Sequence, residues 1–222
     1  RPILRGRDIK RYGFDFADLW LINTHNGIKD KDIPPVDINQ YPAVKAHLDK
    51  YWDKISVRND KGYTPYNLRN CVYTDDFSKQ KIVWGEISDK PKFALDTCGE
   101  YTISNTAFML TGDHLEYLVA ILNSEYSQYC FSRISTTTGE GTVRWLKYKI
   151  ETLPIPPLNR IAEKTILNYL SGLEIEQTVN DSINQIIYNM FNFTDEEIRY
   201  IKENGVWKNN CVNANKPEKR TK

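Results

Sequence analysis

The sequence predicts an α/β domain of the α+β kind: a twisted, mainly antiparallel or mixed sheet with packed helices, followed by a helical C-terminal tail. Three observations support this class. Short runs of β-branched and aromatic residues, separated by Gly, Asp and Asn turns, lie between Val72 and Leu110. Helical periodicity appears on both sides of these runs. A proline-rich segment, Leu153 to Leu158, then separates this region from sequence that is helical throughout.

Local patterns predict the elements of the N-terminal part. Residues 19–23 are apolar, brief and followed by an Asn-Gly turn, which favours a short buried strand. A helix is expected from Pro42 to about Val57, because apolar residues recur there at helical spacing and proline suits a first helical turn. Strands are predicted over residues 81–87, 93–95 and 106–110.

A second helix is expected after Gly112, with Asp113 accepting hydrogen bonds from its first turn. Its buried stripe contains Leu115, Leu118, Val119 and Leu122. A polar Ser/Thr/Gly loop over residues 135–142 follows, and residues 143–146 are predicted as a strand.

The tail is predicted to contain two amphipathic helices, over about residues 161–173 and 179–190. Thr194 and Glu197 form a capping box that starts a third helix, which Gly205 is expected to end. We therefore divide the chain into a domain over residues 1–157, a helical spacer or tail over 158–207, and a basic end over 208–222 that we expect to be disordered.

Composition excludes few partners. The 30 Lys and Arg nearly balance the 29 Asp and Glu, so the net charge of +1 favours no particular ligand. No apolar run approaches the roughly 18 residues that a membrane span needs, and we expect a cytoplasmic protein. The four cysteines are scattered, as is typical of reduced thiols. The chain begins at Arg1 without a methionine, and we expect it to be part of a longer protein.

Catalytic motifs are missing from the sequence. We find no phosphate-binding loop, no G-x-S-x-G turn and no carboxylate set typical of a metal-dependent nuclease. There is also no glycine-rich turn for a dinucleotide or for S-adenosylmethionine, and no metal-ligand spacing among the histidines. The sequence predicts a binding domain that has no catalytic residue, no metal and no cofactor of its own.

Three basic regions are candidate DNA contacts. The first eleven residues hold five cations against one acid, Asp8, and such a cluster fits a phosphate clamp as well as a solvated face. Arg133 and Arg144 flank the polar loop 135–142, which is either a flexible connector or a loop that enters a DNA groove. Lys79 and Lys81 lie at the start of a predicted strand, where lysines can also serve only to prevent pairing at a sheet edge. The candidate contacts are Arg5, Arg7, Lys10, Arg11, Lys79, Lys81, Arg133, Arg144 and Lys147.

Aromatic residues are expected to serve mainly in packing. Trp52, Trp84 and Trp145 lie in apolar patterns and are predicted to be in the core. Tyr63 and Tyr66 are assigned to packing in preference to nucleic-acid contact.

Five segments, in this order, resemble the C-terminal specificity domain of TaqI-like and Eco57I-like DNA methyltransferases. Arg5 to Tyr12 is similar to that family's "RG-K/R-DI-x-RY" opening, and Phe77 to Ile87 to its "F-x-x-x-KIV-x-x-EI" strand. Three later segments are similar to its "N-x-x-F … YLLAILNS" pair, its closing strand with a proline exit, and its "ID-x-LVY-x-LYGLTEEEI" end. They lie at residues 105–124, 141–156 and 183–198.

The resemblance implies recognition of a double-stranded DNA sequence, by residues 1–157, for a type II or IIG restriction–modification enzyme that methylates adenine N6. The family's N-P-P-Y motif and cofactor loop are absent here. An N-terminal methyltransferase domain of the parent chain, with or without a fused endonuclease, is therefore the expected partner. That domain is expected to bind S-adenosylmethionine and the flipped adenine. The resemblance also favours DNA contact by Arg5, Arg7, Lys10 and Arg11, whose dense charge suits phosphate anchoring. Arg133 and Arg144 flank the polar loop and are the candidates for a base contact, with Arg144 as the one to test.

Two alternatives remain at this stage. The chain also fits a specificity subunit of a multi-chain type I restriction system, whose recognition domains leave through a similar "LP-x-PP" segment into a long helix. A protein-interaction module with incidental basic patches is the other alternative.

Overall fold

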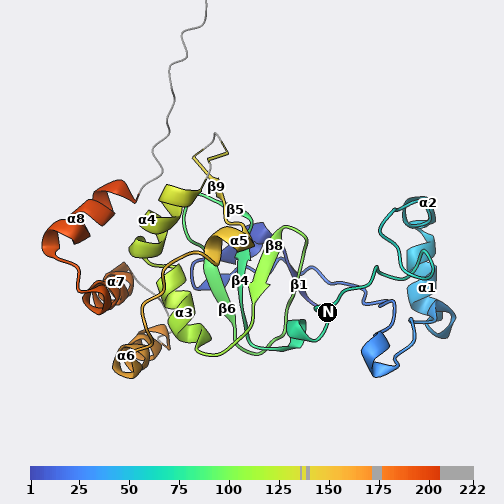
Figure 1. Ribbon diagram of the computed structural model, residues 1–222. Helices are drawn as coiled ribbons and strands as arrows, with labels where there is room; N and C mark the ends of the chain where they lie inside the picture. Colours follow the sequence, from blue (N-terminus) through green and yellow to red (C-terminus); the bar gives the residue numbers. More distant parts are fainter. Residues whose placement is uncertain (136, 139–140, 172–176, 206–222) are drawn as a thin grey trace, which may run out of the picture.

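The computed structural model describes residues 1–135, 137–138, 141–171 and 177–205, and it confirms the α+β class. Its centre is a three-stranded antiparallel sheet in the order β6-β4-β8. These strands are β4 (Lys81–Gly85), β6 (Phe93–Asp96) and β8 (Ala107–Leu110). Figure 1 shows helices α1 and α2 standing away from the sheet on one side and helices α6 to α8 on the other. The three predicted strands are confirmed: the first and third are shorter than predicted, and the second extends one residue further, to Asp96.

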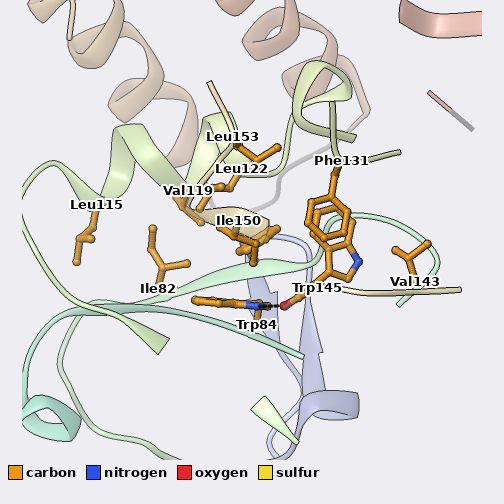
Figure 2. Close-up of a cluster of buried hydrophobic side chains, with 11 residues drawn as sticks. Ile82, Trp84, Leu115, Val119, Leu122, Phe131, Val143, Trp145, Ile150 and Leu153 are labelled. Carbon is orange, nitrogen blue, oxygen red and sulfur yellow. Dashed lines mark hydrogen bonds between the residues drawn. The ribbon is translucent and has the colours of Figure 1, made fainter. Parts of the chain in front are cut away.

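One face of the sheet packs against α3 (Leu115–Leu122), α4 (Glu125–Ile134) and α5 (Lys147–Ile150). Successive side chains of a strand point to opposite faces, so Ile82 and Trp84 both reach this side. Trp84 donates its indole N–H to the carbonyl oxygen of Trp145 at 2.8 Å. Figure 2 shows the cluster around this bond, whose other labelled members are Ile82, Leu115, Val119, Leu122, Phe131, Val143, Ile150 and Leu153.

The opposite face is covered by the N-terminal segment. Its elements are β1 (Ile3–Leu4), the 3-10 helix η1 (Gly6–Asp8), and the antiparallel pair β2 (Ile9–Lys10) and β3 (Gly13–Phe14). Strand β1 pairs in parallel with β7 (Thr102–Ile103). The buried side chains of this layer are Leu4, Ile9, Val83, Ala94 and Ala107.

A second small pairing brings the end of the domain back to the sheet. Strand β5 (Ile87–Ser88) follows β4 and pairs antiparallel with β9 (Val143–Arg144), with Ile87 opposite Arg144. The backbone N–H of Trp145 donates to the carbonyl oxygen of Glu86 at 2.7 Å. The strand predicted over residues 143–146 is therefore confirmed for its first two residues.

The tail consists of α6 (Arg160–Leu170), α7 (Gln177–Phe191) and α8 (Asp195–Asn204). Their apolar faces pack against α3 and α4, where Ile166, Ile183 and Ile187 meet Tyr117 and Ile121. The predicted capping box is confirmed, because Thr194 and Glu197 bond each other's backbone N–H groups and Gly205 follows the last turn. The division at residue 157 stays a prediction, and residues 208–222 lie outside the described residues.

Residues 19–75, which we call the lobe, differ most from the sequence-based expectation. The lobe contains α1 (Pro42–Asp49), α2 (Trp52–Ile55) and the 3-10 helices η2 (Lys29–Lys31) and η3 (Ile38–Gln40); η4 (Asp76–Ser78) follows it. The single helix predicted over 42–57 is therefore two shorter ones. Trp52 is 42% exposed and Trp20 is 62% exposed, so the predicted core position and the predicted buried strand are both wrong. The apolar pattern is present, but no second layer of the lobe covers it.

Two further differences concern the central helices. Asp113 does not cap α3; the N-cap is His114, in a left-handed conformation with φ of 56° and without a side-chain cap. Helix α4 was not predicted, because polar residues such as Ser127 are part of its buried face. Among the described residues, no helix is long and apolar enough to cross a bilayer.

Candidate nucleic-acid interface

A hollow of about 600 Å³ opens where η1, the start of β5 and the turn between β7 and β8 meet. We call this hollow the Arg7 groove. Its walls carry two basic side chains, one acidic side chain, one exposed apolar side chain and a polar turn. The lining residues are Arg5, Gly6, Arg7, Glu86, Ile87, Ser104, Asn105 and Thr106.

The groove exists because two backbones cross without side chains between them. A Cβ atom on Gly6 would lie 2.3 Å from the Thr106 carbonyl oxygen, and one on Gly85 would lie 2.7 Å from the Gly6 carbonyl oxygen. Any side chain at either position would push η1 away from the sheet. Glycine at both positions therefore allows η1 to lie directly against the end of β4.

The conformation of η1 is fixed by an internal ion pair. The Asp8 carboxylate, only 5% exposed, accepts from the Arg5 Nε at 2.9 Å, from its Nη2 at 2.7 Å and from the Arg5 backbone N–H at 2.8 Å. Hydrogen bonds from the Arg5 guanidinium lower the pKa of Asp8 below its ordinary value. The Arg5 guanidinium is thus engaged in holding the turn, and the carboxylate of Asp8 compensates its charge.

Arg7 lies in the middle of this fixed turn and is exposed. Within the part of the chain that the structure describes, its side chain makes no hydrogen bond or ion pair. The guanidinium is therefore available to a ligand in the groove, on a backbone that the neighbouring Arg5–Asp8 pair holds in place.

The facing wall is the turn that connects β7 to β8. The Ser104 N–H donates to the Leu4 carbonyl at 2.8 Å, and the Thr106 carbonyl accepts from the Glu86 N–H at 3.0 Å. The Gly6 N–H donates to the Thr106 hydroxyl oxygen at 3.0 Å, so this turn and η1 are bonded directly to each other. Asn105 is at the tip of the turn, exposed, and its side-chain amide has no bonded partner among the described residues.

The third wall is formed by the start of β5 and its partner strand. Arg144 on β9 donates to the Glu86 carboxylate at 2.8 Å, and both side chains are partly exposed. Ile87, which is 52% exposed, adds an apolar surface beside this pair. The structure therefore brings the predicted Arg7 and Arg144 to one region, although 137 residues separate them in the sequence.

The loop between α4 and β9 is described at its base. The Thr138 N–H donates to the Thr142 carbonyl at 2.9 Å, while residues 136, 139 and 140 at its tip lie outside the described residues. Of the basic residues around this loop, Lys147 is exposed with its Nζ 3.6 Å from Glu151. The Arg133 guanidinium lies over the Tyr129 ring, 4.9 Å from its centroid.

Three other predicted contacts lie outside the groove lining. Lys10 is exposed, with its Nζ 3.4 Å from the Asp15 carboxylate. Arg11 is half-buried and donates to the Asn123 carbonyl. Lys79 is exposed and pairs with Asp76 at 2.7 Å. The five N-terminal cations thus do not form one continuous clamp, because the hairpin that follows η1 directs them to different neighbours.

The assignment of Lys81 to DNA contact is wrong. Its side chain is fully buried, and its ammonium group donates to the Phe77 carbonyl at 2.9 Å and to the Asp96 carboxylate. Asp96 also accepts from two backbone N–H groups, those of Glu100 and Tyr101. Lys81 is the first residue of β4, and its side chain points to the face opposite that of Ile82. This is the face that the N-terminal segment covers.

The candidate contacts drawn from the sequence did not include Asn105. The sequence Ser-Asn-Thr between two predicted strands marks a turn, and this segment is part of the family resemblance. What the sequence does not show is that this turn meets η1, since Gly6 and Thr106 are 100 residues apart.

A model of the TaqI-like C-terminal specificity domain matches residues 1–155, which is more than two thirds of the chain. The chain belongs to this family. The match identifies it as a DNA sequence-recognition domain of restriction–modification methyltransferases. No curated protein matches the sequence.

Proposed function

We propose that residues 1–157 select the target sequence for an adenine-N6 DNA methyltransferase of a type II or IIG restriction–modification system. The observation that carries this proposal is the Arg7 groove. It presents Arg7 and Asn105, both without bonded partners among the described residues, on backbones held together by a hydrogen bond. Arginine and asparagine are the side chains most suited to contact the edges of purine bases.

Phosphate contacts and base contacts have separate roles in such a complex. Lysines and arginines on phosphates give affinity and orientation without sequence information, whereas base contacts in a groove provide the selection. Arg144 and Lys147 lie on β9 and α5, next to the Glu86 wall of the groove. We assign both of them to phosphate contact at the rim.

Catalysis in this proposal belongs to a separate N-terminal domain of the parent protein. That domain would hold S-adenosylmethionine and the flipped adenine, and this chain would fix the register of the duplex.

The experiment measures binding of the purified chain to a pool of random duplexes by fluorescence anisotropy between about 50 and 200 mM salt. The chain is compared with a double variant, Arg144→Ala and Lys147→Ala. A matched control removes two cations from the tail, Lys164→Ala and Lys202→Ala, which lie on α6 and α8. Affinity should fall steeply with salt, and the rim variant should bind more weakly with a shallower salt dependence.

Two results would contradict the proposal. One is the absence of duplex binding even at the lowest salt. The other is an equal loss in the rim variant and in the tail control, because the affinity would then come from unspecific charge. Methyl transfer from S-adenosylmethionine by the purified chain would contradict the assignment of catalysis to another domain.

A further inference from the structure

We infer that the Arg7 groove reads two purine edges in the major groove of DNA, with Arg7 on a guanine and Asn105 on an adenine. This inference rests on the proposed function and adds to it the identity of the base-contacting residues and of the bases. It also differs from the expectation drawn from sequence, in which Arg7 was a phosphate anchor and Arg144 the base contact.

The chemistry of the two side chains supports the assignment. The guanidinium of Arg7 has only donors, in a planar fork that matches the O6 and N7 acceptors of guanine. The amide of Asn105 has a donor and an acceptor, which matches the N7 acceptor and the N6 donor of adenine. Neither side chain has to give up an existing bond within the described structure to make these contacts.

The backbones that carry them are already ordered. Arg7 lies in the turn held by the buried Asp8 carboxylate, which makes three hydrogen bonds of 2.9 Å or less with Arg5. Asn105 lies between Ser104 and Thr106, whose hydroxyl groups are 2.8 Å apart. Little backbone freedom remains to be lost on binding, which favours specific contacts over loose electrostatic ones.

The two segments that carry Arg7 and Asn105 are also bonded to each other. The Gly6 N–H donates to the hydroxyl oxygen of Thr106 at 3.0 Å, and these residues are the direct neighbours of Arg7 and Asn105. Two side chains on segments that are bonded to each other can contact two bases only at a given spacing along the duplex. The groove is therefore suited to recognise a guanine and an adenine at one fixed spacing.

Arg144, beside the third wall, differs from Arg7 in that its guanidinium is already bonded. Its guanidinium is bonded to Glu86 at 2.8 Å, so it compensates a carboxylate that would otherwise repel a nearby phosphate. Ile87 beside it is exposed and apolar, a surface suited to contact with a thymine methyl group. Arg144 thus acts as a positioning and rim residue, and Arg7 provides the free fork.

The experiment begins with selection of a bound sequence from a randomised duplex pool by the full chain. Each guanine and each adenine of the selected duplex is then replaced, one at a time, by its 7-deaza analogue, which removes the N7 acceptor and leaves the phosphates and base pairing intact. Binding is measured for the wild type, for Arg7→Ala and for Asn105→Ala. The matched controls are Arg160→Ala and Asn168→Ala, at exposed positions of α6.

One deazaguanine should weaken wild-type binding by roughly 5- to 150-fold, as should one deazaadenine. The same deazaguanine should have no further effect on Arg7→Ala, and the same deazaadenine none on Asn105→Ala. The α6 controls should respond to both analogues as the wild type does. Because Arg7 and Asn105 are exposed, unfolding midpoints of all variants are expected to agree with that of the wild type.

The outcomes separate the inference from the proposed function. If Arg7→Ala and Asn105→Ala weaken the selected and a scrambled duplex equally, both residues are backbone anchors and the inference is wrong, while DNA recognition stands. If the chain binds duplex DNA but enriches no sequence, the groove reads no base and the inference is again wrong. If the chain binds no duplex at all, the proposed function itself fails.

Discussion

The sheet region and the lobe are held together by different forces. The sheet region buries large apolar side chains on both of its faces, with Trp84 and Phe93 on one and Leu4 and Ile9 on the other. In the lobe, Ile38 is the one buried hydrophobic residue among those that the structure describes. Since apolar burial is the main stabilising term in folding, the lobe must depend on other interactions.

The lobe depends on hydrogen bonds that converge on Asn67, a buried amide. Its Nδ2 donates to the Val36 carbonyl at 2.9 Å, and its Oδ1 accepts from the Thr64 hydroxyl at 2.6 Å. The Arg58 guanidinium donates to the Asn67 carbonyl oxygen. One polar residue thus ties together three segments of the lobe, where the sheet region uses a packed apolar layer. We expect the lobe to open at lower free energy than the sheet.

The largest effect is expected at the buried ion pair of the sheet region. Lys81→Met leaves the Asp96 carboxylate buried without its cation, although two backbone N–H groups still bond it. Removing one partner of a buried pair costs about 3–5 kcal/mol of unfolding free energy. Lys79→Met is the matched control, because Lys79 is exposed and solvent screens its pair with Asp76, which should contribute little to the unfolding free energy.

Urea denaturation of the two variants tests this difference. Equal losses of unfolding free energy in Lys81→Met and Lys79→Met would show that burial of the pair does not decide its contribution. DNA binding sharpens the same comparison, since Lys79 remains a candidate contact and Lys81 does not.

An intermediate effect is expected at the polar centre of the lobe. Asn67→Ala leaves the Val36 carbonyl and the Thr64 hydroxyl without their partner, at about 1–3 kcal/mol. Hydrogen exchange should become faster at the Leu68 amide, which donates to the Thr24 carbonyl, and should stay unchanged at Val83 in β4. Asn59→Ala is the control, because Asn59 is exposed and its side chain has no hydrogen-bond partner among the described residues.

The same experiment can break the comparison. If exchange at Val83 accelerates together with exchange at Leu68, the lobe and the sheet unfold as one unit, and the contrast between them has no energetic meaning.

Periodicity predicted those elements that have a partner layer. The stripe of α3, the three strands of the central sheet and the Thr194–Glu197 capping box all follow from local sequence. Periodicity did not predict the lobe correctly. Its amphipathic pattern indicated that Trp52 is buried, but no layer of the lobe covers this side chain. Helix α4 was missed for the opposite reason: its buried Ser127 gives no apolar signal.

For the candidate site, sequence indicated the types of residue but not their neighbours. The charge cluster led to Arg7 and to Arg5, which both line the groove, but it could not show that Arg5 is bonded to Asp8. Charge alone could not distinguish the exposed Lys79 from the buried Lys81, since this depends on strand alternation against the N-terminal layer. Asn105 gave only a turn signal, and its place opposite Arg7 depends on a contact between distant segments.

The smallest effect is expected at an exposed pair of the lobe. Lys45 and the Tyr66 hydroxyl bond the Asp49 carboxylate at 2.8 and 2.6 Å, and these hydrogen bonds hold the pKa of Asp49 below its ordinary value of 3.8. A carboxyl group whose pKa is lowered in the folded state stabilises that state at pH values above its ordinary pKa. This contribution is lost as the pH falls through the lowered pKa.

Amide exchange in the lobe, corrected for intrinsic rates, should therefore accelerate slightly on acidification in the wild type and less in Asp49→Asn. Asp53→Asn, with no ion pair among the described residues, should follow the wild type. An acid response of Asp49→Asn as large as that of Asp53→Asn would show that the Lys45–Asp49–Tyr66 contacts contribute nothing to the stability of the lobe.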